Sequence, residues 1–230
     1  MKRFSLTLLL FILIIPTTTF ADVFTYTPIK HASFVLQSDQ TTVYVDPVGE
    51  ASLYASFPAP DLILITHIHK DHLALELVAS LKKQNTRILG SPSVIEQLGY
   101  GTAIRNGETT ELLGLEIEAI AAYNTTEERL NFHPQGRDNG YLISKKGVRL
   151  YISGDTEDIP EMRALKEIDV AFVCMNLPYT MTVEQAASAV NEFKPGIVIP
   201  YHYRGKPDMS DLDAFERLVT DSKVSKLEWY

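Results

Sequence analysis

The sequence predicts a layered α/β sandwich, in which helices cover the outer sides of β-sheets. Short apolar runs typical of buried strands recur along the chain, and segments with helical spacing of apolar residues lie between several of them. Both halves of the chain show this alternation. Because the apolar face of a sheet must be covered by another sheet or by helices, such a pattern favours a layered arrangement.

The first half begins with strand-like segments. Ser38-Asp39-Gln40 is typical of a hairpin turn, and the apolar run 61–66 is too apolar for a strand that faces water on either side. Leu73, Leu77, Val78 and Leu81 share one side of a helix. The expected elements are strands at 23–29, 32–37, 42–45 and 61–66, a helix at 73–83, a strand at 87–90, and a helix at 93–98 that Ser91-Pro92 would start.

The second half continues in the same style without repeating the sequence. Lys145-Lys146-Gly147 would join two paired strands, and Thr182 or Thr180 would cap an amphipathic helix. The expected elements are strands at 115–121, 141–144, 148–153, 169–175 and 197–200, helices at 182–193 and from 210, and an edge strand through 227–230.

The N-terminal segment is typical of a secretory signal peptide. Lys2 and Arg3 precede an apolar stretch at 6–15, and Thr19-Phe20-Ala21 has the small-x-small pattern of a cleavage site. The stretch is short for a membrane span. We expect residues 1–21 to be a signal that is cleaved after Ala21, leaving 22–230 as one exported domain, periplasmic or secreted. An uncleaved signal that anchors the chain to a membrane is the alternative.

The composition limits the partners. The net charge of −8 becomes −10 when the two positive charges of Lys2 and Arg3 are removed, which argues against nucleic-acid binding through a broad basic face. Cys174 is the single cysteine, so no intramolecular disulfide can form. Its apolar surroundings favour a buried, inert thiol. Nothing in the composition indicates an oligomeric state.

A cluster of metal-ligand types follows the strand expected at 61–66. The segment 66–72 reads Thr-His-Ile-His-Lys-Asp-His, so four donors lie within six positions. Protonated imidazoles repel one another at such a density, and a desolvated carboxylate needs a counter-charge. A divalent cation meets both needs. The alternative is a solvated polar loop, but outside the cluster the chain has only three histidines, His31, His133 and His202.

Three further donors stand at or near the ends of expected strands. Asp155 follows a strand and Gly154, which would let backbone come close, and His202 follows the strand at 197–200. His133 lies in a loop before the strand at 141–144. The strand ends at one edge of a sheet are where α/β folds gather their sites. We therefore expect these residues to join the cluster.

These segments resemble the metallo-β-lactamase fold superfamily. The resemblance rests on the His-x-His-x-Asp-His signature at 67–72, followed in order by His133, the Ser-Gly-Asp segment at 153–155 and His202, and it covers nearly the whole mature chain. The segments 176–181 and 132–136 are similar to the compact branch that includes ascorbate-6-phosphate-lactonase-like metal-dependent hydrolases, and N-acyl phosphatidylethanolamine phospholipase D belongs to a similar branch. The resemblance implies an αββα four-layer sandwich of two mixed β-sheets with helices on the outer faces.

The resemblance also implies two metal ions, for which zinc is preferred and manganese or iron is an alternative. His67, His69 and His133 would bind one ion, Asp71, His72 and His202 the other, with Asp155 bridging both. Alternate residues of an extended loop project to the same side, which agrees with His67 and His69 sharing an ion. Outside this set, Asp46 would brace the ligand loop. His31 is either a strand residue without a role in the site or a residue at its rim.

The implied activity is metal-dependent hydrolysis of a small ester, lactone or phosphodiester. A hydroxide held by two metal ions would attack, and Asp71 would act as the catalytic residue that orients it and carries its proton. Basic residues near the histidines could suit an anionic substrate, although ordinary surface charge explains each equally well; they are Arg129, Arg137, Arg204 and Lys206. A β-lactamase-type amide hydrolase is one alternative. A non-enzymatic metal- or partner-binding protein is another, and it would have closed coordination.

Overall fold

The computed structural model describes residues 20–230. The predicted signal at 1–21 lies outside the described residues except for Phe20 and Ala21, which begin a short helix, α1 (Phe20–Val23). Within the described part of the chain, no helix combines the length and the apolar character needed to cross a membrane.

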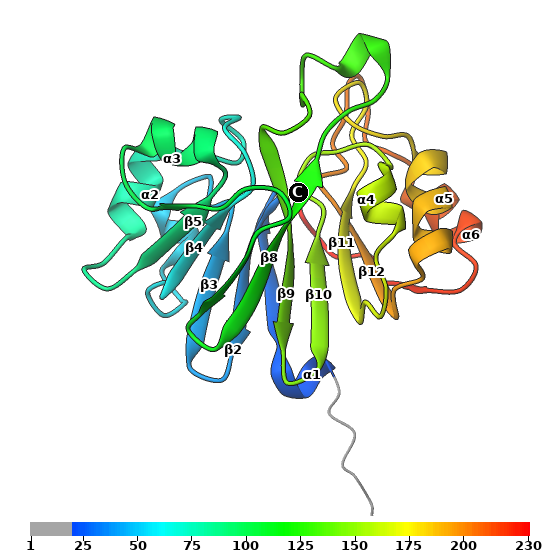
Figure 1. Ribbon diagram of the computed structural model, residues 1–230. Helices are drawn as coiled ribbons and strands as arrows, with labels where there is room; N and C mark the ends of the chain where they lie inside the picture. The colour runs from blue at the N-terminus through cyan, green and yellow to red at the C-terminus, as the bar shows by residue number, and fades with distance from the viewer. Residues whose placement is uncertain (1–19) are drawn as a thin grey trace, which may run out of the picture.

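Two mixed β-sheets form the centre of the molecule, and helices cover the outer side of each, as Figure 1 shows. This confirms the predicted αββα sandwich. The first sheet has the order β1-β2-β3-β4-β5-β6, antiparallel from β1 to β3 and parallel from β3 onward. Its strands are β1 (Thr25–Lys30), β2 (Ser33–Ser38), β3 (Thr41–Val45), β4 (Leu62–Ile65), β5 (Arg87–Gly90) and β6 (Thr102–Ala103).

The second sheet has the order β13-β12-β11-β10-β9-β8-β7. It is parallel from β13 to β10 and antiparallel from β10 to β7. Its strands are β7 (Thr109–Leu112), β8 (Leu115–Ala122), β9 (Asp138–Lys145), β10 (Val148–Ile152), β11 (Val170–Cys174), β12 (Ile197–Tyr201) and β13 (Lys223–Val224).

The helices divide between the two outer faces (Figure 1). On the first sheet lie α2 (Leu75–Leu81) and α3 (Pro92–Leu98), and on the second lie α4 (Pro160–Arg163), α5 (Val183–Phe193) and α6 (Leu212–Leu218). Thr182 caps α5, as predicted: its side chain accepts from the backbone N–H of Gln185, whose side chain accepts from the N–H of Thr182. Two single 3-10 turns, at Ala51–Tyr54 and Glu127–Arg129, complete the described helices.

The alternation of side chains along the strands builds two cores. In β4, Leu62 and Leu64 face the second sheet, whereas Ile63 and Ile65 face α2 and α3. All four are fully buried, which explains why this strand carries no polar residue. Phe34 of β2 stacks on Phe172 of β11 with ring centroids 4.4 Å apart, and this contact joins the two sheets.

The C-terminal segment differs from the prediction. The expected edge strand at 227–230 is wrong, because the edge strand is β13 and residues 225–230 form no strand. Trp229 instead inserts its ring against Phe34 and Tyr201, and its carbonyl accepts from the N–H of His31 at 3.1 Å. Burial of the indole therefore takes the chain away from the sheet edge. The short strands β6 and β7 and the helix α4 were not predicted.

Candidate metal centre

The structure brings together all seven predicted metal ligands. Three overlapping groups each have one potential donor atom per residue, with all these atoms within 4.8 Å of one another. The first group is His67, His69 and His133, the second is His31, Asp71, His72 and His202, and the third is His67, His72 and Asp155. The first two groups match the division implied by the resemblance, with His31 added to the second. In the third group, Asp155 lies with one histidine from each of the first two groups, His67 and His72.

Strand ends deliver these donors. His67 follows β4, Asp155 follows β10 and His202 directly follows β12, while His133 lies in the loop between β8 and β9. Gly154 has φ +62°, and a Cβ atom there would lie 2.6 Å from the carbonyl oxygen of Asn139. The backbone of Asn139 thus comes close to Gly154, and this explains why a glycine precedes the carboxylate of Asp155.

Hydrogen bonds leave an acceptor nitrogen of His67 directed toward the cluster. The Thr66 hydroxyl donates to Asp46 Oδ2 at 2.6 Å, so toward His67 Nδ1, 3.0 Å away, it can only accept. His67 then carries its proton on Nδ1 and has a lone pair on Nε2, which lies 3.1 Å from His69 Nδ1. This is the tautomer that a metal ligand requires.

Asp46, predicted to brace the ligand loop, contacts both Thr66 and His72. Its carboxylate is fully buried, accepts from the backbone N–H of Thr66 at 2.7 Å, and lies 2.7 Å from His72 Nδ1. Because an ionised carboxylate can only accept, Nδ1 of His72 is the protonated nitrogen. Its other nitrogen, Nε2, has no hydrogen-bond partner among the residues that the structure describes and lies 3.4 Å from Asp155 Oδ1.

Asp138 makes the same kind of contact with His133, and it was not predicted from the sequence. Asp138 Oδ2 lies 3.0 Å from His133 Nδ1, and Arg137 donates to both oxygens of the carboxylate at 2.7 and 2.8 Å. A carboxylate five residues after a candidate ligand, at the start of a buried strand, was the available signal. Each of the two donor groups therefore contains a histidine held by a buried aspartate.

The separations between donors suit zinc. Asp155 Oδ2 lies 3.5 Å from His133 Nε2 and 3.3 Å from His202 Nε2, so one carboxylate reaches both groups. His202 Nε2 lies 3.7 Å from Asp71 Oδ2. Two donors about 2.0–2.1 Å from one tetrahedral zinc ion lie about 3.4 Å apart. The buried Asp155 Oδ1 has no hydrogen-bond partner among the described residues, and a cation would satisfy it. The donor set therefore fits a pair of divalent ions.

The electrostatics favour neutral imidazoles at His67, His69 and His202, an ionised Asp155, and positive charge at His72. Burial lowers the pKa of His67, His69 and His202, and neighbouring imidazoles lower it further. Burial alone would raise the pKa of Asp155, but the imidazoles of His202 and His72 hold it well below its usual value. Burial alone would lower the pKa of His72, but the carboxylates of Asp155 and Asp46 raise it to about 9. The carboxylates thus favour positive charge at the centre, which a divalent cation supplies while the imidazoles stay neutral.

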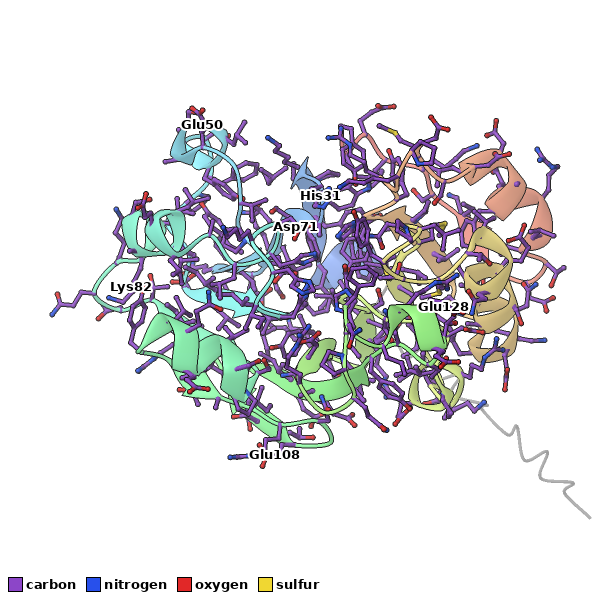
Figure 2. The ribbon with its side chains drawn as sticks, turned by 90° about the horizontal axis from the view of Figure 1, so that it is seen from above. His31, Glu50, Asp71, Lys82, Glu108 and Glu128 are labelled. Atoms are coloured by element: carbon purple, nitrogen blue, oxygen red, sulfur yellow. The ribbon has the colours of Figure 1, made fainter. Side chains whose placement is uncertain are left out.

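His31 lies in the site and is not a strand residue away from it. Its Nε2 is 3.0 Å from Asp71 Oδ2, and its ring centroid is 3.9 Å from that of His202. Figure 2 shows His31 and Asp71 side by side near the centre of the molecule. The backbone of His31, Asp46 and His202 has positive φ, at 62°, 42° and 45°. Such conformations in residues other than glycine are unfavourable and gather at functional sites.

A cavity of about 400 Å³ opens onto the donors. Its floor includes Asp71, His133 and Asp155, and Phe132 and Tyr179 contribute aromatic rings in edge-to-face contact, with centroids 5.0 Å apart. A volume of this size accommodates a small organic molecule. Five of the seven donors line the cavity, namely His69, Asp71, His133, Asp155 and His202, so the centre opens to it, unlike a closed coordination site.

The four basic residues named in the sequence analysis divide into two pairs. Arg129 is held by Glu157 at 2.7 Å, and Arg137 is held by Asp138, so neither side chain is free to meet a ligand. Arg204 and Lys206 line the cavity, and neither forms an ion pair with the residues described. Only this second pair is placed to meet an anionic group.

Comparison with known proteins agrees with this fold and centre. The chain belongs to the β-lactamase superfamily domain family, whose model matches residues 25–202. It is 33% identical over 171 residues to a UPF0173 metal-dependent hydrolase of Thermococcus onnurineus (strain NA1), covering 70% of this chain and 75% of that protein.

Two solved structures share the fold over nearly their whole length. One is a proposed metal-dependent hydrolase from Parabacteroides distasonis ATCC 8503, with 43% identity, a TM-score of 0.84, and coverage of 90% of this chain and 94% of the other. The other is Igni18, a metallo hydrolase of Ignicoccus hospitalis KIN4/I, with 26% identity, a TM-score of 0.76, and coverage of 90% and 95%. The predicted superfamily is confirmed, and the protein is a metal-dependent hydrolase of the metallo-β-lactamase superfamily.

Proposed function

We propose that this chain is an exported hydrolase with two zinc ions, which cleaves a small anionic ester, lactone or phosphodiester. The observation that carries the proposal is the position of Asp155, whose carboxylate lies within 3.5 Å of donor nitrogens in both histidine groups. His67, His69 and His133 would hold one ion, and Asp71, His72 and His202 the other. Bound there, two divalent ions would activate water near neutral pH and offset the negative charge that develops on the substrate.

Asp71 is the residue best placed to handle a proton. Its side chain is half exposed at the cavity, whereas Asp155, which also lines the cavity, is buried. Burial alone would raise the pKa of Asp71, but the hydrogen bond from His31 and the charge of His72 bring it below the usual value. An ionised Asp71 can orient a water molecule, accept its proton and pass it to the leaving group.

The anionic substrate is inferred from Arg204 and Lys206. Both belong to the segment after β12, so they stand on the cavity wall next to His202. A carboxylate or phosphate held there would place the neighbouring carbonyl or phosphorus centre over Asp71 and Asp155. The rings of Phe132 and Tyr179 would pack against the apolar part of the substrate.

The metal assignment is tested by replacing the shared carboxylate. In Asp155→Ala, we expect the zinc content measured by atomic emission to fall below two ions per chain and turnover of a generic phosphodiester or ester to be lost. Asp39→Asn is the control, because Asp39 is an exposed carboxylate that pairs with Lys145 and Lys146. Zinc content and turnover that equal the wild-type values in Asp155→Ala would refute the two-metal proposal.

The substrate class is tested with matched esters that differ in one carboxylate. In Arg204→Ala, KM for the anionic ester should rise at least tenfold, while KM for the neutral ester should stay within about twofold. Lys82→Ala, which removes a lysine outside the cavity, should change neither. An equal loss for both esters would show that Arg204 supports the cavity wall and does not recognise charge.

Export is proposed from the N-terminal sequence alone. The full chain, expressed in a Gram-negative host, should appear in the periplasmic fraction with a mass that corresponds to cleavage after Ala21. Recovery in the cytosolic fraction at full mass would contradict it.

A further inference from the structure

Tyr230, His31 and Asp71 form a chain of hydrogen bonds that begins outside the metal centre. The backbone N–H of Arg204 donates to the Tyr230 hydroxyl at 3.3 Å, the hydroxyl lies 3.0 Å from His31 Nδ1, and His31 Nε2 lies 3.0 Å from Asp71 Oδ2. Neighbouring contacts fix this segment, because Trp229 is buried and its carbonyl accepts from the N–H of His31. Residues far apart in the sequence thus meet at one side of the cavity.

The Asp71 end of this chain sets the direction of the bonds to His31 when its ring carries one proton. A backbone N–H can only donate, and the carboxylate of an aspartate ionised at neutral pH can only accept. Because Asp71 can only accept, the ring proton of His31 lies on Nε2, and Nδ1 is left as an acceptor to which the Tyr230 hydroxyl donates while it accepts the Arg204 N–H. His31 then carries its proton on Nε2 and donates it to Asp71. The reverse tautomer would set a nitrogen lone pair against the carboxylate oxygen.

This direction decides between two roles for His31. Its Nε2 lies near the donor atoms of Asp71, His72 and His202 and could serve as a further metal ligand. A nitrogen that holds a proton has no lone pair for a metal. The hydrogen-bond chain therefore makes His31 a donor to Asp71, and Asp71 keeps its second oxygen free.

We infer that Tyr230 and His31 are positioning residues, which orient the Asp71 carboxylate through this directed chain, and that His31 does not bind metal. The inference deepens the proposed function and rests on the role of Asp71 given there. The Tyr230 ring makes a second contact, because the Arg204 guanidinium lies over it, 4.1 Å from the ring centroid. One tyrosine therefore contacts both the orienting group of Asp71 and the residue proposed to recognise the anion.

Tyr230→Phe separates the contact with His31 from the contact with Arg204, because it removes the hydroxyl and keeps the ring under Arg204. In zinc-loaded protein labelled with 15N-histidine, we expect the wild-type His31 to be protonated on Nε2, and Tyr230→Phe to yield a mixture of tautomers. The kcat should fall about tenfold, the scale seen when a residue that orients a metal ligand is removed. KM for the anionic ester and the zinc content should stay unchanged. Tyr100→Phe, at an exposed tyrosine outside the cavity, is the control.

A second background tests the direction of the chain. Gln at position 31 can donate an amide N–H to Asp71 without help from a tyrosine hydroxyl, so His31→Gln should keep most of the kcat. In that background, adding Tyr230→Phe should have no further effect, whereas a merely structural role of the hydroxyl would give the same loss in both backgrounds.

Several results would overturn the inference. They are a wild-type His31 that is protonated on Nδ1, a His31 whose Nε2 signal shows zinc coordination, and a kcat unchanged in Tyr230→Phe. The tautomer measurement requires no turnover. A wild-type protein that hydrolyses none of the test esters would therefore contradict the proposed function, and the His31 signal would still decide on the chain.

Discussion

Replacing Asp46 with asparagine tests how the fold prepares His72 for a metal. The carboxylate accepts from the Thr66 backbone N–H through Oδ1, and through Oδ2 it meets both the Thr66 hydroxyl and His72 Nδ1. Asparagine has the same shape but one acceptor oxygen. If that oxygen keeps the bond to the backbone N–H, the amide group faces His72 and donates to Nδ1. The proton of His72 then moves to Nε2, the nitrogen proposed to bind metal.

The expected loss follows from this change of tautomer. Removing the partner that orients a ligating histidine lowers metal affinity about 10–100-fold, or about 1.4–2.8 kcal/mol. Asp46 is fully buried and makes no contact with the cavity, so the loss should fall on metal binding, first on the ion that His72 would hold, and not on substrate binding. The Thr66 hydroxyl also loses Oδ2 as its acceptor and can then donate to His67 Nδ1, which would move the proton of His67 to Nε2. The ion held by His67, His69 and His133 should therefore be weakened as well.

Asp138→Asn is the matched control, because Asp138 holds His133 in the other group through the same kind of contact. Zinc affinities would be measured by calorimetric titration of the wild type, both single variants and the double variant. Asp138→Asn should weaken one ion, whereas Asp46→Asn should weaken the ion held through His72 and also that held through His67. In the double variant both ions should be weak, because the two aspartates together orient ligands of both ions.

Two results would refute this reasoning. Asp46→Asn that binds both ions as tightly as the wild type would show that the carboxylate does not set the tautomer of His72. A double variant that retains one tight ion would show that both aspartates act on the same ion, and the division of ligands between two ions would then be wrong.

Three further predictions concern stability, measured by urea or thermal unfolding. Gly154→Ala should lower the free energy of unfolding by about 1–3 kcal/mol, because the backbone there has positive φ and the new Cβ would clash with neighbouring backbone. Gly147→Ala, where φ is also positive but the space is open, should lower it by less. Equal losses in the two variants would exclude the clash as a cause. Burial alone would raise the pKa of Glu157, but hydrogen bonds from Thr125 hold it below its usual value of 4.5. The stabilising effect of the ionised carboxylate is therefore present above pH 4.5 and is lost as the pH falls below that value. Glu157→Gln should therefore be about 2 kcal/mol less stable at pH 7, with the difference shrinking toward pH 3; a constant difference would contradict this. Thr182→Ala should lower stability by about 1 kcal/mol through loss of the α5 cap, and an unchanged midpoint would contradict it.

The parts of the fold that were predicted from sequence are those with strong local patterns. The run 62–65 is apolar at every position because both of its faces are covered, and the positions of His67 and Asp155 follow from the ends of such strands. Local pattern also predicted the Thr182 cap. In each case the residues that decide the structure are neighbours in the sequence.

The parts that were missed depend on residues far apart in the chain. Nothing near Trp229 indicates that its ring packs between the two sheets, and Asp138 shows its role only when His133 is folded against it. The same holds for Arg129, which the sequence left as a candidate for anion binding until its pairing with Glu157 was seen. Contacts of this kind carry no periodic signal that a local pattern could reveal.

The placement of Asp155 and His67 on different sheets has a consequence for the order of events during maturation. A chain in which only the first sheet has formed offers the cluster at 67–72 alone, without the shared carboxylate or His202. Tight uptake of metal therefore has to wait until both halves have docked. Once bound, the ions would oppose their separation, because ligands that bind only the native state stabilise it. Chelation should in turn loosen the junction between the halves before it disturbs either sheet.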